Sequence, residues 1–330
     1  MKARARNLKG KSILTVKQMT PEEIRDLIDL AAELKRKKQS GRRGNLLKRK
    51  NIALIFEKSS TRTRCAFTVA AADEGAHTDF LNISDIHFGK KESLADSARV
   101  LGRMFDGIAF RGYRHDTVEA LARHAGVPVW NGLTDIAHPT QILADLLTIQ
   151  EHFGDFRGLK VVYIGDGRNN VASSLMVGCV KMGMDFVNCT PPELLPDPAL
   201  LAEVEAMTGA TGGSLRIVHD PAVAVRGAHI IYTDVWVSMG EEAEFDNRRR
   251  LLGPYQVTMD LMRKTGNLDS GRMIFLHCLP AFHNHETDIT REIGAMEVTD
   301  EVFESAFSRV FDQAENRMHT IKAVMVATMK

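Results

Sequence analysis

The residues best suited to chemistry form one run of hydroxyl and cationic side chains, from Lys58 to Arg64 (KSSTRTR). The run follows a short apolar stretch, residues 52–56, that predicts a buried strand. It precedes a second apolar stretch, residues 65–72, that predicts a helix. A helix N-terminus exposes backbone N–H groups and attracts anions, and guanidinium groups match phosphate oxygens. The run therefore predicts a phosphate site, although a helix cap in a solvated basic turn would use the same residues.

Other polar residues recur where predicted strands end. Because ligands of open α/β sheets bind beyond the carboxyl ends of the strands, this placement predicts a site rather than scattered surface polarity. The residues are Arg111 after strand 107–110, His138 beyond strand 127–130, Asn169 and Asn170 after strand 160–165, Asp234 after strand 229–233, and Cys278 after strand 273–277.

The polar residues of the first half are cationic or hydrogen-bonding, which suits a small phosphorylated ligand that also carries a carbonyl or an amide. His138 precedes a predicted helix and has arginines nearby in the expected fold. Both effects disfavour the imidazolium, so we expect a neutral ring that donates to a carbonyl oxygen. Read singly, His138 could be only a helix cap and Gln141 only a surface residue.

The second half has the opposite character. Asp234 could bind an ammonium group, and Gly240 in the loop after it could act as the hinge of a lid. Asp234 could equally cap a helix. Cys278 is open to three interpretations, a nucleophile, a ligand contact or a buried thiol, of which the last is the commonest fate of a cysteine.

The elements that must position these residues alternate between strand and helix along the chain of 330 residues. A capping box at Thr20 starts an amphipathic helix over 21–38, and residues 312–330 predict one last helix. The length and the alternation predict an α/β protein with two doubly wound parallel-sheet domains that face a cleft and are joined by interdomain helices.

Charge and cysteine usage exclude several classes. Residues 1–50 hold 16 Lys and Arg against 5 Asp and Glu, yet the whole chain has a net charge of +1 and those 50 residues contain no aromatic side chain. We therefore expect no nucleic-acid partner. No apolar run is long enough for a signal peptide or a membrane span, so no membrane partner is expected either. The four cysteines, at 65, 179, 189 and 278, have no metal-site spacing, which predicts a reducing cytoplasm.

The turn from Gly165 to Asn170 (GDGRNN) superficially resembles a dinucleotide-binding loop. It lacks the third glycine and has Arg and Asn where a backbone must approach a pyrophosphate. This disfavours a nicotinamide oxidoreductase, which remains one alternative.

With these motifs assembled, the chain resembles the ornithine carbamoyltransferases of the aspartate/ornithine carbamoyltransferase family over nearly its whole length. The motifs that carry the resemblance are FEKSSTRTR at 56–64, HPTQ at 138–141, Asp234 to Gly240, HCLP at 277–280 and AENRMH at 314–319. The resemblance implies transfer of the carbamoyl group of carbamoyl phosphate to the δ-amine of L-ornithine, giving L-citrulline and phosphate. It implies no metal and no organic cofactor, and a homotrimer or a multiple of trimers.

The resemblance also assigns domains and residues. Residues 1–149, joined by the helix 313–330, would bind carbamoyl phosphate, and residues 150–312 would bind ornithine. Catalytic roles fall to Arg62, Arg111, His138 and Cys278. Carbamoyl phosphate would contact Ser60, Thr61, Arg62, Thr63, His87, Arg111, His138, Gln141, Cys278, Leu279 and Arg317; ornithine would contact Asn170, Asp234, Ser238 and Met239. His87, which would reach across a subunit boundary, departs from the glutamine common in the family.

Other acceptors and other classes remain as alternatives. Putrescine lacks the α-carboxylate that ornithine carries, whereas an aspartate site would need basic groups where this chain has Asp234. A binding module that has lost the chemistry is disfavoured because every expected motif position is intact.

Overall fold

The computed structural model describes residues 8–82, 86, 88, 91–237 and 241–329. His87, Ser238 and Met239, which the resemblance assigns to ligand binding, and Gly240, the suggested hinge, lie outside the described residues. The chain divides into two compact units, Met1–Leu147 with Glu315–Lys330, and Thr148–Ala314. Both divisions fall inside helices, α5 (Pro139–Phe153) and α13 (Val310–Met329).

The first unit contains a four-stranded parallel sheet in the order β2-β1-β3-β4. Its strands are β1 (Asn51–Phe56), β2 (His77–Asn82), β3 (Gly107–Arg111) and β4 (Val129–Leu133); its helices are α1 (Pro21–Gln39), α2 (Thr61–Asp73), α3 (Leu94–Met104), α4 (His115–His124) and the first part of α5, with a short 3₁₀ helix, η1 (Val16–Gln18). Thr20 caps α1 in the predicted capping box.

Alternate residues of these strands pack on opposite faces of the sheet, as the period of two requires. Val129 joins a core cluster with Val118 and Leu121 of α4, whereas the next residue, Trp130, packs on the other face. There the Trp130 ring stacks on Phe67 of α2 with ring centroids 6.3 Å apart. The sheet is therefore buried on both sides, as expected for parallel strands.

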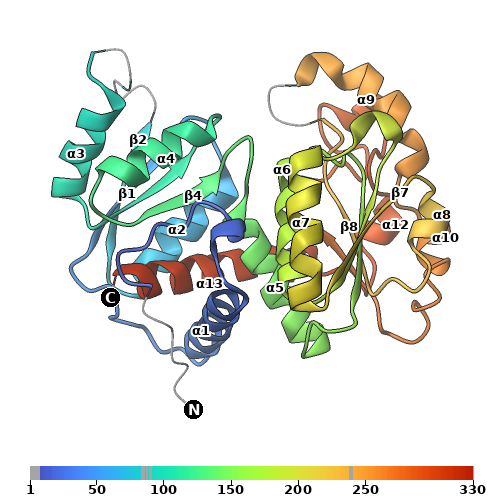
Figure 1. Ribbon diagram of the computed structural model, residues 1–330, viewed down its shortest axis with the longest axis horizontal. Coiled ribbons are helices and arrows are strands. Elements are labelled where there is room, and N and C mark those ends of the chain that lie inside the picture. The colour runs from blue at the N-terminus through green and yellow to red at the C-terminus, as the bar shows by residue number, and fades with distance from the viewer. Residues whose placement is uncertain (1–7, 83–85, 87, 89–90, 238–240, 330) are drawn as a thin grey trace. The chain divides into compact units, whose positions relative to one another are not determined.

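Helix α13 returns from the end of the chain to the first unit, where Figure 1 shows it beside α1. Lys35 of α1 donates to Asn316 at 2.8 Å, and the Trp130 indole donates to Thr328 at 3.0 Å. Lys322, only 1% exposed, pairs with Asp73 at the end of α2. The lysine and the hydroxyl groups have partners inside the unit, which offsets the cost of burying them.

The second unit contains a five-stranded parallel sheet in the order β7-β6-β5-β8-β9. Its strands are β5 (Lys160–Ile164), β6 (Asp185–Cys189), β7 (Ser214–Val218), β8 (Ile230–Thr233) and β9 (Ile274–His277). Helices α6 (Asn170–Lys181) and α7 (Pro198–Thr211) lie on one face (Figure 1). Besides the end of α5 and the start of α13, the other helical segments that the structure describes in this unit are η3 (Pro192–Leu194), α8 (Pro221–Ala224), η4 (Glu242–Glu244), α9 (Phe245–Leu252), η5 (Gly253–Tyr255), α10 (Met259–Arg263), α11 (Thr290–Ile293) and α12 (Asp300–Phe303).

The predicted α/β class with two parallel sheets is confirmed, with two local differences. Helix α2 begins at Thr61, not after the basic run, because Ser60 caps it. Strand β4 runs from Val129 to Leu133, whereas the sequence predicted a strand over 127–130. The Asn131 side chain is buried and donates to the carbonyl of Leu14 at 3.0 Å, so a neighbouring segment satisfies a residue that usually favours turns.

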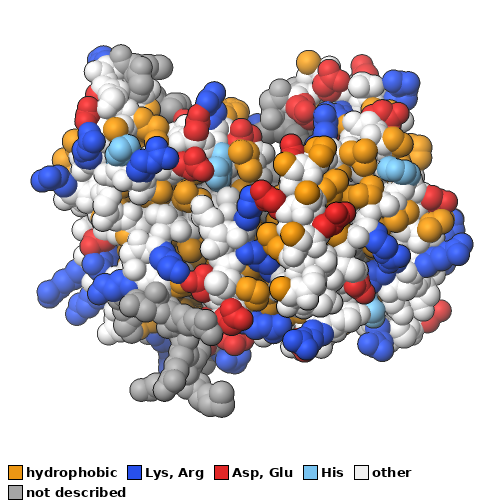
Figure 2. All heavy atoms as spheres, in the orientation of Figure 1, with side chains coloured by type: hydrophobic (Ala, Val, Ile, Leu, Met, Phe, Trp, Pro, Cys, Tyr) orange, Lys and Arg blue, Asp and Glu red, His pale blue; other side chains and the backbone are white. Residues whose placement is uncertain are grey.

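The charge of the surface and the hydrophobicity of the helices bear on which partners the protein can bind. On the face drawn in Figure 2, Lys and Arg side chains are interspersed with Asp and Glu over the second unit. Of the helices among the described residues, none is both long and apolar enough to cross a membrane.

Gly102 of α3 gives a stability prediction. A Cβ atom there would lie 1.7 Å from the carbonyl oxygen of Ala125, a backbone atom that follows α4. We expect Gly102→Ala to lower the free energy of unfolding by about 2 kcal/mol or more, because the two segments must separate. Urea unfolding followed by circular dichroism measures this.

Gly209 of α7 is the matched control, since a Cβ there meets nothing within 4 Å and the residue is exposed. Gly209→Ala should stabilise by about 0.5–1 kcal/mol through helix propensity. Equal effects of the two substitutions would contradict the packing explanation.

Candidate functional site

The turn from β1 into α2 brings the predicted anion-binding residues to a helix N-terminus. Ser60 is the N-cap, and its Oγ accepts from the backbone N–H of Thr63 at 3.3 Å. Thr61, Arg62 and Thr63 therefore occupy the first turn of a 13-residue helix, where backbone N–H groups and the helix dipole favour an anion.

The hydroxyl of Thr63 is the point at which donors from other segments converge. Arg111, the last residue of β3, donates to it from Nη1 at 3.4 Å, and the Ser60 hydroxyl donates to it at 3.1 Å. Arg317 of α13 donates to the same oxygen through Nη2. Arg317 also donates through Nη1 to Oε1 of Gln141, on α5, at 3.2 Å. Residues far apart in the sequence thus meet at one buried oxygen of the first unit.

His138 lies immediately before α5 and is 3% exposed. Burial, followed by the positive charges of Arg317, Arg111 and Arg62, holds its pKa well below the usual value. The ring is therefore neutral at pH 7, as the sequence predicted. The larger cause is burial, which its sequence neighbours do not show.

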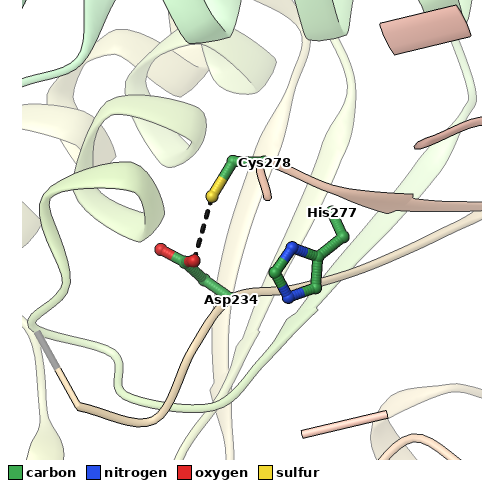
Figure 3. A group of neighbouring side chains, drawn as sticks. All are labelled: Asp234, His277 and Cys278. Carbon is green, nitrogen blue, oxygen red and sulfur yellow. Dashed lines mark hydrogen bonds between the residues drawn. The ribbon is translucent and has the colours of Figure 1, made fainter. Parts of the chain in front are cut away.

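In the second unit, Asp234 follows β8 and Cys278 follows β9, and the two side chains point toward each other (Figure 3). The thiol Sγ donates to Oδ1 of Asp234 at 2.9 Å. Asp234 is 6% exposed and Cys278 is partly exposed. A buried carboxylate at the carboxyl end of a parallel sheet is suited to a cationic group.

His277 holds the turn that presents Cys278 and Leu279. Its Nδ1 accepts from the backbone N–H of Leu279 at 2.9 Å, so the proton of a neutral ring is on Nε2, which lies 3.1 Å from Oε1 of Glu297. Leu279 has φ of +59°, a conformation that side chains other than glycine rarely adopt. Such residues cluster at functional sites when their surroundings hold them.

Asp234, His277 and Cys278 each offer a donor atom within 4.8 Å of the other two, a grouping that could hold a metal ion. Both nitrogens of His277, however, already have protein partners, and the thiol is directed at the carboxylate (Figure 3). A metal bound to either nitrogen of His277 would have to displace the contact that this nitrogen makes with Leu279 or Glu297, so these contacts fit a polar ligand site better than a metal centre.

Asn170 is the first residue of α6, after a turn in which Asn169 is the N-cap and accepts from Val171 N–H at 2.7 Å. The turn is held by Asp166, 2% exposed, which pairs with Arg248 at 3.2 Å and with Arg168 at 3.3 Å. Asn170 therefore sits at a second helix N-terminus, on a turn fixed by ion pairs.

Sequence reasoning missed several residues that support the site. Glu297 and Arg248 pair with residues 20 and 82 positions away, a relation that local patterns do not contain. Asp145 is different, since it lies four residues after Gln141 on a predicted helix and accepts from Gln141 Nε2 at 2.8 Å. The i, i+4 spacing could have identified it.

Two family models match the chain. Residues 11–151 match the aspartate/ornithine carbamoyltransferase carbamoyl-P binding domain, and residues 157–328 match the Asp/Orn binding domain of the same enzymes. The chain belongs to the aspartate/ornithine carbamoyltransferase family. Family membership was predicted from the motifs and is confirmed.

Known relatives agree with the family models. The chain is 57% identical to the catabolic ornithine carbamoyltransferase of Bacillus licheniformis, over 98% of this chain and 97% of the relative. It is 54% identical to the catabolic enzyme of Clostridium perfringens, over 98% of each. Its structure is similar to that of the ornithine carbamoyltransferase of Pyrococcus furiosus, with a TM-score of 0.90, 44% identity and 98% of each chain covered.

The family models and the compact units differ at the C-terminus. The model of the Asp/Orn binding domain extends to residue 328, whereas Glu315–Lys330 belong to the first unit. The contacts of Arg317, Lys322 and Thr328 with Thr63, Asp73 and Trp130 explain why α13 is part of the first unit.

The lowered pKa of His138 predicts a pH dependence of stability. Between its folded and unfolded pKa values the unfolded chain binds more protons, so the free energy of unfolding rises with pH. The stability that the neutral His138 ring contributes is fully present above about pH 6.5. On acidification the free energy of unfolding then falls by up to ~1.4 kcal/mol per pH unit. His138→Asn should make the dependence between pH 5 and 7 shallower in urea unfolding.

His77, which is exposed, provides the control substitution, His77→Asn. This control substitution should leave the slope of the free energy of unfolding against pH as it is in the wild type. An unaltered slope in His138→Asn would contradict a neutral buried ring.

Proposed function

We propose that this chain is an ornithine carbamoyltransferase, which transfers the carbamoyl group of carbamoyl phosphate to the δ-amine of L-ornithine and releases L-citrulline and phosphate. The observation that carries the proposal is the convergence of Arg111 and Arg317 on the Thr63 hydroxyl at the start of α2. An oxygen has two lone pairs, so three donors at one hydroxyl are more than it can satisfy well. Anionic oxygens of a phosphate supply the further acceptors.

The first unit, by this proposal, binds carbamoyl phosphate, and the second binds ornithine, with domains 1–149 plus 313–330 and 150–312. Thr61, Arg62 and the backbone N–H groups of the first turn of α2 bind the phosphate together with Ser60 and Thr63. His138 and Gln141 bind the carbamoyl group, with Cys278 and Leu279 of the second unit. Asn170 and Asp234 bind the amino-acid end of ornithine. His87, Ser238 and Met239 keep the roles assigned from the sequence.

The mechanism follows from charge. The δ-amine attacks the carbonyl carbon as the neutral species, which forms a C–N bond and places negative charge on the carbonyl oxygen. The Arg111 guanidinium, the Thr63 hydroxyl and the neutral His138 ring are the donors that stabilise this oxyanion. The C–O bond to phosphate then breaks, the proton of the attacking amine passes to the leaving phosphate, and Arg62 and Arg111 balance the charge of that phosphate.

Assembly and location complete the proposal. The resemblance implies a homotrimer or a multiple of trimers, and Val100 and Met104 of α3, 47% and 68% exposed, are apolar side chains that contact with another copy would cover. Sedimentation equilibrium would measure the mass of the assembly.

The four cysteines are free thiols, which fits an enzyme of the cytoplasm.

The deciding experiment measures ureido product from carbamoyl phosphate with ornithine, putrescine, lysine or aspartate offered separately. We expect citrulline from ornithine and little product from the other acceptors. Preference for putrescine would mean that the α-carboxylate is not recognised and that the role of the Asp234 loop is misassigned. Absence of product with every acceptor, in folded protein, would contradict the proposed reaction.

The role of Arg62 predicts a large kinetic effect. Arg62→Gly should lower kcat by about 10²-fold or more, because a donor to the transition-state charge is lost. Steady-state kinetics at saturating ornithine measures this.

Arg64→Gly is the control for Arg62→Gly, since it costs the same helix propensity two residues further along α2. Arg64 is exposed, and its guanidinium lies over the Phe80 ring at 3.8 Å. Its kcat should stay within about threefold of the wild type. Near-normal turnover in Arg62→Gly would show that Arg62 is not catalytic.

A further inference from the structure

A buried carboxylate lies behind the carbamoyl-phosphate residues. Asp145 is on α5 and is 0% exposed, among apolar neighbours such as Ile142 and Leu146 that are also 0% exposed. Burying an ionised carboxylate is costly unless hydrogen bonds compensate it. Asp145 lies one helical turn from Gln141, and its Oδ1 accepts a hydrogen bond from Gln141 Nε2 at 2.8 Å.

The bond fixes which end of the Gln141 amide faces which neighbour. An ionised carboxylate only accepts hydrogen bonds, so it can hold only the NH₂ end of the amide. The carbonyl oxygen, Oε1, is then directed at Arg317, whose Nη1 donates to it at 3.2 Å. With the amide reversed, NH₂ would face a guanidinium that has only donors, and two bonds would be lost.

Arg317 carries the effect to the anion site. While Nη1 is held by Gln141, Nη2 of the same planar group donates to the Thr63 hydroxyl at the start of α2. A guanidinium held through two of its nitrogens has a fixed direction, which lowers the entropy that ligand binding must remove. The side chains Asp145, Gln141, Arg317 and Thr63 thus form one chain of hydrogen bonds inside the first unit.

We propose that Asp145 is a positioning residue for the carbamoyl-phosphate subsite: its carboxylate fixes the orientation of the Gln141 amide and, through it, the direction of Arg317. The inference deepens the proposed function and rests on it for the identity of the ligand. Asp145 is bonded to Gln141 within the first unit, so its loss weakens anion binding without altering the ornithine subsite.

The test compares two substitutions of similar size. Asp145→Leu removes the acceptor, and Asp145→Asn retains an oxygen that can still accept from Gln141. The probe is inorganic phosphate, whose dissociation constant is measured by calorimetry and needs no turnover. Asp145→Leu should weaken phosphate binding by about tenfold or more, whereas Asp145→Asn should stay within about threefold. In kinetics, KM for carbamoyl phosphate should rise in Asp145→Leu while KM for ornithine changes less than twofold.

A double substitution tests whether Asp145 acts through Gln141. Gln141→Met replaces the amide by an apolar group of the same shape, so adding Asp145→Leu to it should weaken phosphate binding no further. This double variant removes both partners of the buried bond, and therefore folds even where Asp145→Leu alone does not. Thr148→Val, a loss of a buried hydroxyl three residues along the same helix, is the control and should bind phosphate as the wild type does.

The outcomes separate this inference from the proposed function. Wild-type phosphate affinity in Asp145→Leu, equal losses in Asp145→Asn and Asp145→Leu, or additive losses in the double variant would each overturn the positioning role. Failure of the wild type to form any ureido product would instead overturn the proposed reaction, and the phosphate measurements would still decide the role of Asp145.

Discussion

The hydrogen bonds that meet at the Thr63 hydroxyl are the constraint on which the first unit depends. They join the first turn of α2 to the end of β3 and to α13, three elements that the chain reaches at widely separated positions. A hydrogen bond from a charged donor contributes only about 1.5–3 kcal/mol net, and the Arg111 contact, at 3.4 Å, is long. The main effect of these bonds is on geometry, because together they fix the directions of the Arg111 and Arg317 guanidinium groups relative to the N-terminus of α2.

The two units share one architecture, but the polar residues at their strand ends have opposite electrostatic character. Each places polar residues after the carboxyl ends of parallel strands. In the first, guanidiniums surround a histidine that stays neutral, which favours an anion and supplies a donor that carries no charge of its own. In the second, Asp234 and Cys278 form a pair with acceptor character. A reaction between an anionic carbamoyl donor and an amino acid needs cationic groups for the first and acceptor groups for the second. A single sheet whose strand ends carried only one of these two kinds of group would not provide both.

The sequence predicted the features that local patterns encode. Strand and helix periods and the position of Asp234 and Cys278 after strands were readable, and the structure places them accordingly, whereas the start of α2 at the Ser60 cap was missed. The partners of His277 and Asp166 were not readable, because Glu297 and Arg248 meet them only through tertiary packing. The extension of β4 past residue 130 was not readable for the same reason, since the carbonyl that satisfies the Asn131 side chain belongs to Leu14.

The return of α13 to the first unit has a consequence for biosynthesis. The anion site begins at residue 60, yet Arg317 must join it, so the site stays incomplete until the whole second unit has been translated. Lys322 and Thr328, which bind Asp73 and Trp130, follow still later. A chain interrupted anywhere in the second unit therefore yields a fragment without this arginine, and the proposed phosphate site can form only after synthesis has passed residue 317.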